Sequence, residues 1–275
     1  MSTVRPAGFA VALLLLFALQ LTGLAHEGLR EQIVQLNASI KSDPRNGALY
    51  LRRAELYRLH REFGRALADY RSAEQMNPSL EQVNLARGML YLDAAQPRRA
   101  RYYLDRFLLT HPDHSTALVA RARALTKMGE PSRAVDDYSR AIGVDPKPDL
   151  YLERARALGK SGAGIDEVLR GLGEGIERLG PIVTLELAAI DLEVAASRFD
   201  RALKRLDIIA AQSDRKEHWL VRRGEILRKA GRYGEACETM RGALSVIESQ
   251  PQRRRASFDV ALETRVRASV ARCRH

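Results

Sequence analysis

Apolar side chains recur at helical spacing along most of this chain. In one typical run they stand three or four positions apart, at Phe63, Ala66, Leu67, Tyr70 and Ala73. That spacing places them on one face of an α-helix. Asn77-Pro78 follows, and proline ends a helix because it lacks an amide donor and disfavours helix in the residue before it. Runs that alternate apolar and polar residues, as half-buried strands do, do not occur, so the pattern predicts an all-α protein.

The pattern returns every 34 residues. Prolines stand at this interval at Pro44, Pro78, Pro112 and Pro146. Alanines recur at this interval, or at twice this interval, at Ala66, Ala100, Ala134, Ala202 and Ala236. Twelve residues before each of these alanines stand Ala54, Gly88, Ala122, Ile190 and Gly224. Three series in phase indicate a structural repeat, and the two apolar runs in each unit predict a pair of antiparallel helices that approach closely where the side chains are small.

The two ends of the chain fit the same scheme. Residues 28–41 make one amphipathic helix, which predicts half a unit at 26–46, before six helix pairs at 47–248. In the last segment, 251–275, apolar residues recur every four positions at Phe258, Leu262, Val266 and Val270. Arginines occupy its other face. Because terminal units of a repeat need a polar outer face, this segment is predicted to be a capping helix.

Residues 1–25 are predicted to be an export signal rather than part of the fold. An apolar run at 9–21 is followed by small residues at Gly23 and Ala25, which fit a cleavage site after Ala25. The run is shorter than the ~20 residues that span a membrane. Cleavage would leave His26 at the N-terminus and place the mature chain in the periplasm. The alternative is an uncleaved signal that anchors the chain to the membrane.

The sequence offers little catalytic chemistry. Gly159-Lys160-Ser161 is like the end of a phosphate-binding loop, but Arg154 stands where that loop needs glycine, and a helix precedes it instead of a strand. The six histidines do not cluster at the spacing of metal ligands, and Cys237 has no positioned base near it in the sequence. We therefore expect no catalytic residue, no metal and no cofactor, so the chain is not expected to be an enzyme.

The repeat resembles that of the tetratricopeptide repeat family, which has 34 residues, small residues at its eighth and twentieth positions and a closing proline. The resemblance rests on residues 50–78, 122–146 and 224–243, and it extends over 47–248. It implies a right-handed superhelical solenoid of antiparallel helix pairs. It also implies a protein that holds another macromolecule in a concave groove lined by the first helix of each pair.

Carried over by position, the groove residues of the family are mostly cationic in this chain. They are Arg52, Glu55, Arg58, Arg123, Lys127, Arg156, Lys160, Arg222, Arg228 and Lys229. The whole chain has 45 Lys and Arg against 34 Asp and Glu. Such a groove would attract an acidic protein or peptide. The alternatives are solvated helix faces in an arginine-rich chain, or a protein that binds a polyanion such as an envelope glycolipid. Nucleic acid is disfavoured by the export signal.

Other arginines stand directly before the small eighth position. They are Arg53, Arg87, Arg121, Arg154 and Arg223. Asp69 and Asp137 lie sixteen residues after Arg53 and Arg121, where an antiparallel hairpin would bring them together. These two arginines are therefore predicted to form ion pairs within a unit, each worth about 1 kcal/mol where exposed.

Two cysteines exclude a disulfide-dense scaffold and a four-cysteine metal site. Cys237 lies early in the last second helix, and Cys273 lies at the end of the capping helix. If these helices fold back on each other near residue 252, Cys237 faces about Arg267, which leaves a gap of roughly 9 Å along the helix. That exceeds the ~7 Å limit on Cα separation in a disulfide. A longer or bent connection would close the gap, so a disulfide and two free thiols both remain open.

Overall fold

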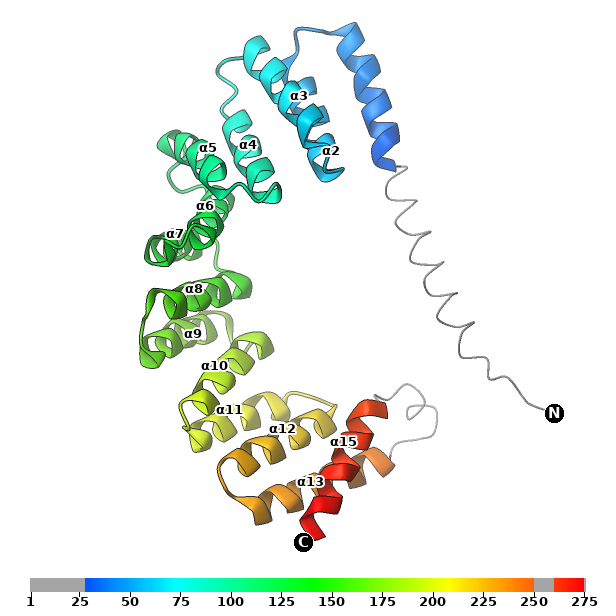
Figure 1. Ribbon diagram of the computed structural model, residues 1–275, viewed down its shortest axis with the longest axis vertical. Coiled ribbons are helices and arrows are strands. Elements are labelled where there is room, and N and C mark those ends of the chain that lie inside the picture. Colours follow the sequence, from blue (N-terminus) through cyan, green and yellow to red (C-terminus); the bar gives the residue numbers. More distant parts are fainter. Residues whose placement is uncertain (1–27, 250–259, 275) are drawn as a thin grey trace, which may run out of the picture. The chain divides into compact units, whose positions relative to one another are not determined.

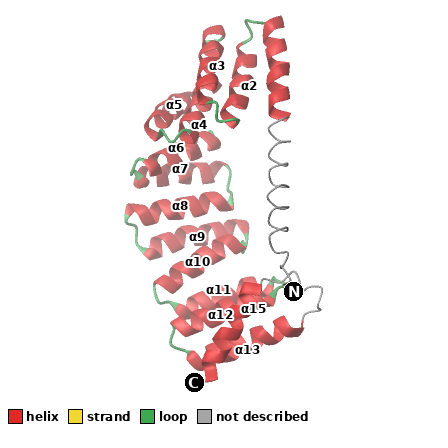
Figure 2. Cartoon of the chain, turned by 45° about the vertical axis from the view of Figure 1, so that its right-hand side comes forward, coloured by secondary structure: helices red, strands yellow, loops and turns green. Residues whose placement is uncertain are grey.

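All the regular structure in the part of the chain that the computed structural model describes, residues 28–249 and 260–274, is helical (Figure 2). This confirms the all-helical prediction. The export signal predicted at 1–25 and the start of the predicted capping segment lie outside the described residues. No helix within the described ranges is both long enough and apolar enough to cross a membrane. The chain divides into two compact units, Met1–Glu130 and Pro131–His275.

The first unit stacks helical hairpins in two layers. Its elements are a helix at 28–42, α2 (Gly47–Leu59), α3 (Phe63–Met76), α4 (Gln82–Asp93), α5 (Pro97–Thr110) and α6 (Ser115–Lys127) (Figure 1). Helix α2 packs against α3, and α4 packs against α5, as the two helices of a hairpin. The first helices α2, α4 and α6 also contact one another in series. They therefore make one continuous layer within this unit.

The second unit repeats this plan. Its elements are α7 (Pro131–Val144), α8 (Pro148–Ser161), α9 (Ile165–Leu179), α10 (Val183–Ala195), α11 (Phe199–Ala211), α12 (Lys216–Lys229), α13 (Tyr233–Ser249), α15 (Val260–Ala271) and a short 3-10 helix at Arg272–Arg274. Helices α8 and α9, α10 and α11, and α12 and α13 pack as hairpins, and α15 packs on α13. A buried cluster around Ile190 and Leu206 joins α10, α11 and α12.

Small residues at the eighth position of the repeat let the two helices of a hairpin touch. A Cβ added at Gly88 of α4 would lie 2.6 Å from Cγ of Leu104 on α5. At Gly224 of α12 it would lie 2.8 Å from Cε of Met240 on α13. Both distances are below van der Waals contact. A methyl group at Gly88 would therefore collide with the branched part of Leu104, whereas the flexible end of Met240 can move away from one at Gly224.

The turn inside each unit has one residue in the left-handed region, at the same repeat position in five units and one residue earlier, at Gly162, in the fourth. Glycine fills it at Gly129 and Gly231, with φ of 79° and 75°. At the same position in other units stand Arg61, Ala95 and Ser197, with φ of 62°, 54° and 59°. Left-handed backbone costs an L-residue free energy that glycine avoids. The turn geometry is thus dictated by the hairpin packing and is adopted even where the residue does not favour it.

The arginines directly before the small eighth position of the repeat connect helices, and one of the two predicted ion pairs is confirmed. Arg53 donates two hydrogen bonds of 2.7 Å to the Asp69 carboxylate, which confirms that pair, and a third of 2.7 Å to Asn37 in the preceding helix. Arg121 bonds to Asp105, sixteen residues before it, at 3.0 Å. The sequence reasoning considered only acids sixteen residues later. Because a first helix lies between two second helices, its arginine reaches partners on either side.

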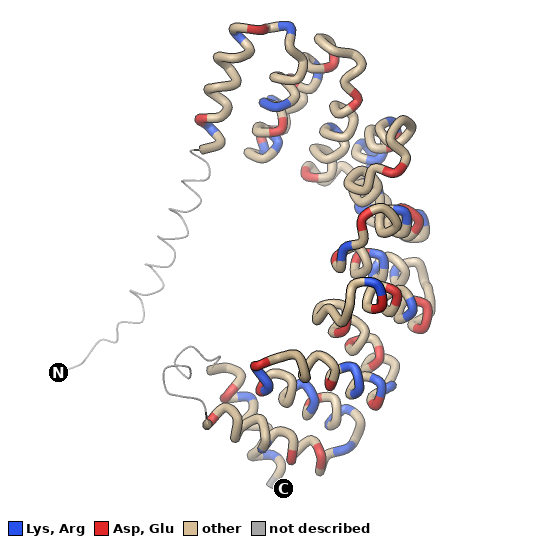
Figure 3. The backbone as a smooth tube through the Cα atoms, turned by 180° about the vertical axis from the view of Figure 1, so that it is seen from behind, with Lys and Arg blue, Asp and Glu red and all other residues tan. Residues whose placement is uncertain are grey.

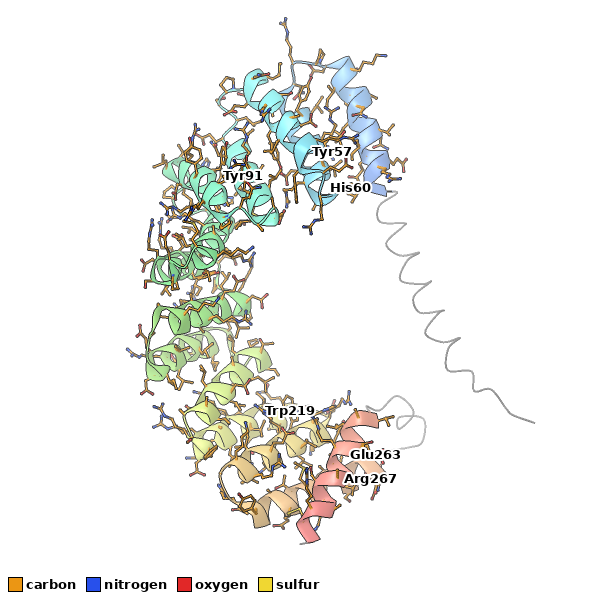
Figure 4. The ribbon with its side chains drawn as sticks, viewed as in Figure 1. Tyr57, His60, Tyr91, Trp219, Glu263 and Arg267 are labelled. Carbon is orange, nitrogen blue, oxygen red and sulfur yellow. A yellow bond between two sulfur atoms is a disulfide. The ribbon has the colours of Figure 1, made fainter. Side chains whose placement is uncertain are left out.

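The capping helix α15 is fixed to α13 at both ends of their contact. Leu262 and Val266 are buried against α13, and Arg267 forms an ion pair of 2.9 Å with Glu248 (Figure 4). Cys237 and Cys273 are joined in a disulfide with a Cα separation of 5.7 Å. The 9 Å mismatch expected for a pivot at residue 252 is wrong.

The two cysteines are level because of where α13 ends and α15 begins. α13 continues to Ser249, and α15 begins only at Val260. Cys237 therefore lies twelve residues before the end of one helix, and Cys273 lies thirteen residues after the start of the other. The two distances match, so the antiparallel packing brings the cysteines level.

Candidate binding surface

The predicted groove residues all lie on first helices. Arg52, Glu55 and Arg58 are on α2, Arg123 and Lys127 on α6, Arg156 and Lys160 on α8, and Arg222, Arg228 and Lys229 on α12. The residues on α2 and α6 belong to the first unit, and those on α8 and α12 belong to the second. Each unit therefore has its own candidate binding surface on its first helices.

The Arg58 and Glu55 side chains of α2 are engaged in a network with neighbouring helices. Nε of Arg58 donates to Oε2 of Glu55 at 3.1 Å, and the guanidinium also pairs with Asp93 of α4. The hydroxyl of Tyr70 on α3 donates to the other Glu55 oxygen. Burial, and then this hydrogen bond to Glu55, raise the pKa of Tyr70 above its usual range, so the phenol stays protonated as a donor. Arg58 therefore joins two repeats through Asp93, and Glu55 is engaged by Arg58 and Tyr70, so neither is a free charge for a ligand.

Arg222 on α12 is held in the same way. It pairs with Asp191 on α10 and lies 3.7 Å from Glu225 on its own helix. Asp191 lies 31 residues before Arg222, as Asp93 lies 35 residues after Arg58. In both cases an arginine of one first helix pairs with an acid of the adjacent first helix. The prediction treated these positions as groove cations without considering such cross-repeat partners.

The other predicted cations are exposed. Among the described residues, none forms an ion pair with Arg52, Lys127, Arg156, Lys160, Arg228 or Lys229; Arg123 is also exposed. Arg228 and Lys229 lie in the last turn of α12, where cations are favoured by the helix dipole. Arg52 lines a small cavity of about 170 Å³ with Gln32, Gln35, Leu36 and Ser39. These exposed cations are the part of the predicted site that can meet a ligand.

Figure 3 marks the charged residues along the chain, and their counts differ between its parts. Residues 28–130 carry 17 Lys and Arg against 11 Asp and Glu, whereas residues 131–249 carry 20 of each. The excess of positive charge in the described repeats therefore belongs to the first unit. A cationic ligand site in the second unit must come from local arrangement, as on α8, and not from net charge.

The other candidate motifs are structural. Gly159-Lys160-Ser161 forms the end of helix α8, where the Ser161 hydroxyl donates to the Leu158 carbonyl at 2.8 Å. His114 caps α6 by accepting a hydrogen bond from the Ala117 amide at 3.2 Å. Within the described ranges, no group of three or more His, Cys, Asp and Glu side chains is placed to hold a metal ion.

The sequence reasoning missed a second exposed surface on α5, which carries Arg98, Tyr102, Arg106 and Leu109. Tyr102 and Leu109 are large and exposed, although they lie on a second helix. The signal that could have found them is the comparison of equivalent positions between repeats, because the other repeats have different residues there.

Comparison with known proteins places the architecture in a family. A family model described as tetratricopeptide repeat matches residues 85–150 and 187–261, just over half of the 275 residues. No curated protein matches the sequence significantly. Solved structures that are similar include a tetratricopeptide repeat protein from Parabacteroides merdae ATCC 43184, at 18% identity and a TM-score of 0.52, with 92% of this chain and 100% of that chain covered.

Two further structures share the fold. PilW, described as a widely conserved type IV pilus biogenesis factor, is 20% identical with a TM-score of 0.56, covering 74% of this chain and 96% of its own. YrrB, described as a TPR protein with an unusual peptide-binding site, is 19% identical with a TM-score of 0.52, covering 64% and 91%. At these identities the likeness concerns the fold alone. Together with the family match and the helical hairpins, it shows that this chain belongs to the tetratricopeptide repeat family.

Proposed function

We propose that this protein is a non-enzymatic scaffold of a bacterial-type cell envelope that binds an acidic protein or peptide on its first helices. Proteins of this family mediate protein–protein interactions, and YrrB is described as having a peptide-binding site. The observation that carries the proposal is the set of exposed cations on first helices that have no ion-pair partner among the described residues. Arg156 and Lys160 on α8 and Lys127 on α6 are the clearest examples.

The mechanism is preorganisation. The first helices are fixed by their hairpins and by cross-repeat pairs such as Arg58 with Asp93. The exposed cations of each unit therefore stand on first helices that are fixed within that unit, and binding loses little backbone entropy. Carboxylates of a partner would pair with them, and the strength of those pairs would fall as salt increases. A polyanion would need a longer run of positive charge than the balanced residues 131–249 supply.

The test uses the full-length protein in cells that produce it. Chemical crosslinking in the native envelope captures the partner, which is identified and purified. Arg156→Glu/Lys160→Glu should then weaken its binding by about tenfold or more. The matched control is Arg201→Glu/Lys204→Glu, which makes the same charge change on exposed positions of the second helix α11 and should leave affinity unchanged. Equal losses in both variants, or no loss in either, would refute the first-helix site.

The location is tested separately. The apolar run at 9–21 and the small residues Gly23 and Ala25 support export with removal of residues 1–25. N-terminal sequencing of the protein from the envelope fraction should begin at His26. Membrane-bound protein that begins at Met1 would identify an uncleaved anchor, and protein found only in the cytoplasm would contradict the envelope assignment.

A further inference from the structure

The outer face of α5 carries large side chains that the packing of this helix does not use. Its buried residues, which face α4 and α6, are Ala100, Leu104, Phe107 and Leu108. On the opposite face, Tyr102 and Leu109 are 56% and 82% exposed, and Arg98 and Arg106 are exposed beside them. These four residues, the α5 stripe, are spaced by four, four and three positions. They therefore form one line along the helix.

The repeat itself shows that this stripe is not a requirement of the fold. The equivalent positions 34 residues earlier, on α3, are Gly64, Ala68, Ser72 and Gln75. Those 34 residues later, on α7, are Ser132, Asp136, Arg140 and Gly143. Helices with the same role in the hairpin thus form with small or polar residues on this face. The aromatic, aliphatic and cationic side chains of α5 need another explanation.

The side chain of Tyr102 is supported by neighbouring rings. It meets Tyr103 edge-on, with centroids 5.0 Å apart, and Tyr103 stacks on Tyr91 of α4 at 5.5 Å (Figure 4 labels Tyr91). The guanidinium carbon of Arg106 lies 6.0 Å from the Tyr102 ring centroid. These contacts restrict the ring before any partner arrives, so an apolar partner side chain would bind it at low entropic cost.

A basic cavity adjoins one end of the stripe. It has a volume of about 490 Å³ and is lined by Gln96, Pro97, Arg98, Arg99, Lys127 and Met128. All three charged side chains in this lining are cationic. Arg98 belongs to both the stripe and the cavity, and no described residue forms an ion pair with Arg98, Arg106 or Lys127. The surface thus combines exposed apolar area with positive charge that no described acid offsets.

We propose that the α5 stripe and this cavity form a docking site for an acidic polypeptide segment that also carries apolar side chains. The apolar side chains would pack on Tyr102 and Leu109, while carboxylates would pair with Arg98, Arg106 and Lys127. Tyrosine and arginine are, with tryptophan, enriched among the residues that anchor protein interfaces. A nucleic acid would gain nothing from the exposed Leu109 and would need more phosphate contacts than these cations provide. The site shares Lys127 with the first-helix surface but otherwise goes beyond it, because the stripe lies on a second helix.

The first stage of the test finds a ligand of the expected chemistry. Short random peptides displayed on phage are selected on the immobilised full chain and counter-selected on a Tyr102→Ala/Leu109→Ala variant. Alanine is the natural residue at the position of α3 that is equivalent to Tyr102, namely Ala68, so this variant should fold. Circular dichroism checks that it does. Enriched peptides should carry Asp or Glu beside aromatic or aliphatic residues. Enrichment of neutral or basic peptides, or none that depends on the two side chains, would overturn the proposal.

The second stage measures affinity with a synthetic, fluorescein-labelled copy of one enriched peptide. Arg98→Glu/Arg106→Glu should raise its Kd by about tenfold or more. The matched control is Arg45→Glu/Arg71→Glu, two exposed arginines of the same unit without an ion pair to a described residue, which should change Kd by less than about twofold. If both double variants lost the same affinity, the effect would come from net charge alone, and the proposed site would be wrong.

Other occupants give distinguishable results. Arg156→Glu/Lys160→Glu should leave the Kd of this peptide unchanged, so a failure of the α5 site and a failure of the first-helix surface appear in different variants. If that double abolishes peptide binding, the peptide lies elsewhere and the proposal is wrong. It is also overturned by a dimer in sedimentation analysis that Tyr102→Ala dissociates, or by tighter binding of a mixed-sequence single-stranded oligonucleotide than of the peptide.

Discussion

Loss of the Cys237–Cys273 bond should loosen the capping helix without unfolding the rest of the repeat. The two cysteines are 36 residues apart in the sequence, and the chain-entropy relation for a loop of this length gives a stabilisation of about 4 kcal/mol. Measured values for disulfides are more often ~2–4 kcal/mol. Without the bond, α15 is held mainly by Leu262 and Val266, whose burial contributes roughly 1.5–3 kcal/mol each. The disulfide is therefore comparable to the hydrophobic contact it supplements.

Hydrogen exchange measures this locally, which matters because repeat proteins often open from an end. In Cys237→Ser/Cys273→Ser, amides of α15 should exchange about 30- to 700-fold faster, as ~2–4 kcal/mol implies. Amides of α4, in the other unit, should be unaffected. Oxidised wild-type protein unfolded in denaturant should show no thiols that react with a titrant. Two reactive thiols per chain, or identical exchange of α15 in both proteins, would refute the reasoning.

Two further perturbations test the packing and the electrostatics. Gly88→Ala should destabilise the protein by ~1–3 kcal/mol in urea unfolding, because the new methyl group collides with Leu104. The control Gly242→Ala should stabilise it by ~0.5–1 kcal/mol, because nothing lies within 4 Å of the new methyl group. Equal effects of the two substitutions would contradict the close approach of the helices at Gly88. The hydrogen bond from Arg198 lowers the pKa of Asp166, so the stability linked to this group is present above the pKa of the unfolded state and is lost as pH falls through the folded value. Arg198→Gln should raise that pKa toward its ordinary value in a carboxyl NMR titration, and an unchanged pKa would show that the pair does not form.

The helices were predictable from the sequence because each depends on residues close to one another. Three series with a period of 34 located the hairpins, and glycine and proline marked most of their ends. The left-handed turns at Arg61, Ala95 and Ser197 were not predictable from residue type, since none of the three favours that conformation. They followed only from the position in the repeat, where Gly129 and Gly231 stand in other units.

The candidate site was less predictable because pairing depends on adjacent repeats. Arg58 and Arg222 occupy groove positions, yet each is paired with an acid on the adjacent first helix. The position of an arginine within its own repeat cannot reveal such a partner. The partner acid stands in the adjacent repeat, and the residue at that position differs from unit to unit. The connection between α13 and α15 presents the same difficulty, since its length decides whether Cys237 and Cys273 are level.

Net charge is therefore a poor guide to where this protein binds. The excess of basic residues suggests a uniformly positive groove, but the second unit is balanced between 131 and 249, and some of its arginines join helices. What separates a binding cation from a structural one is whether an acid is within reach in the folded chain. The repeat supplies the reference for that decision, because each position can be compared with its equivalents 34 residues away. By this criterion α5 differs from α3 and α7, which have small or polar residues where it exposes Tyr102 and Leu109 beside arginines that form no ion pair with a described residue.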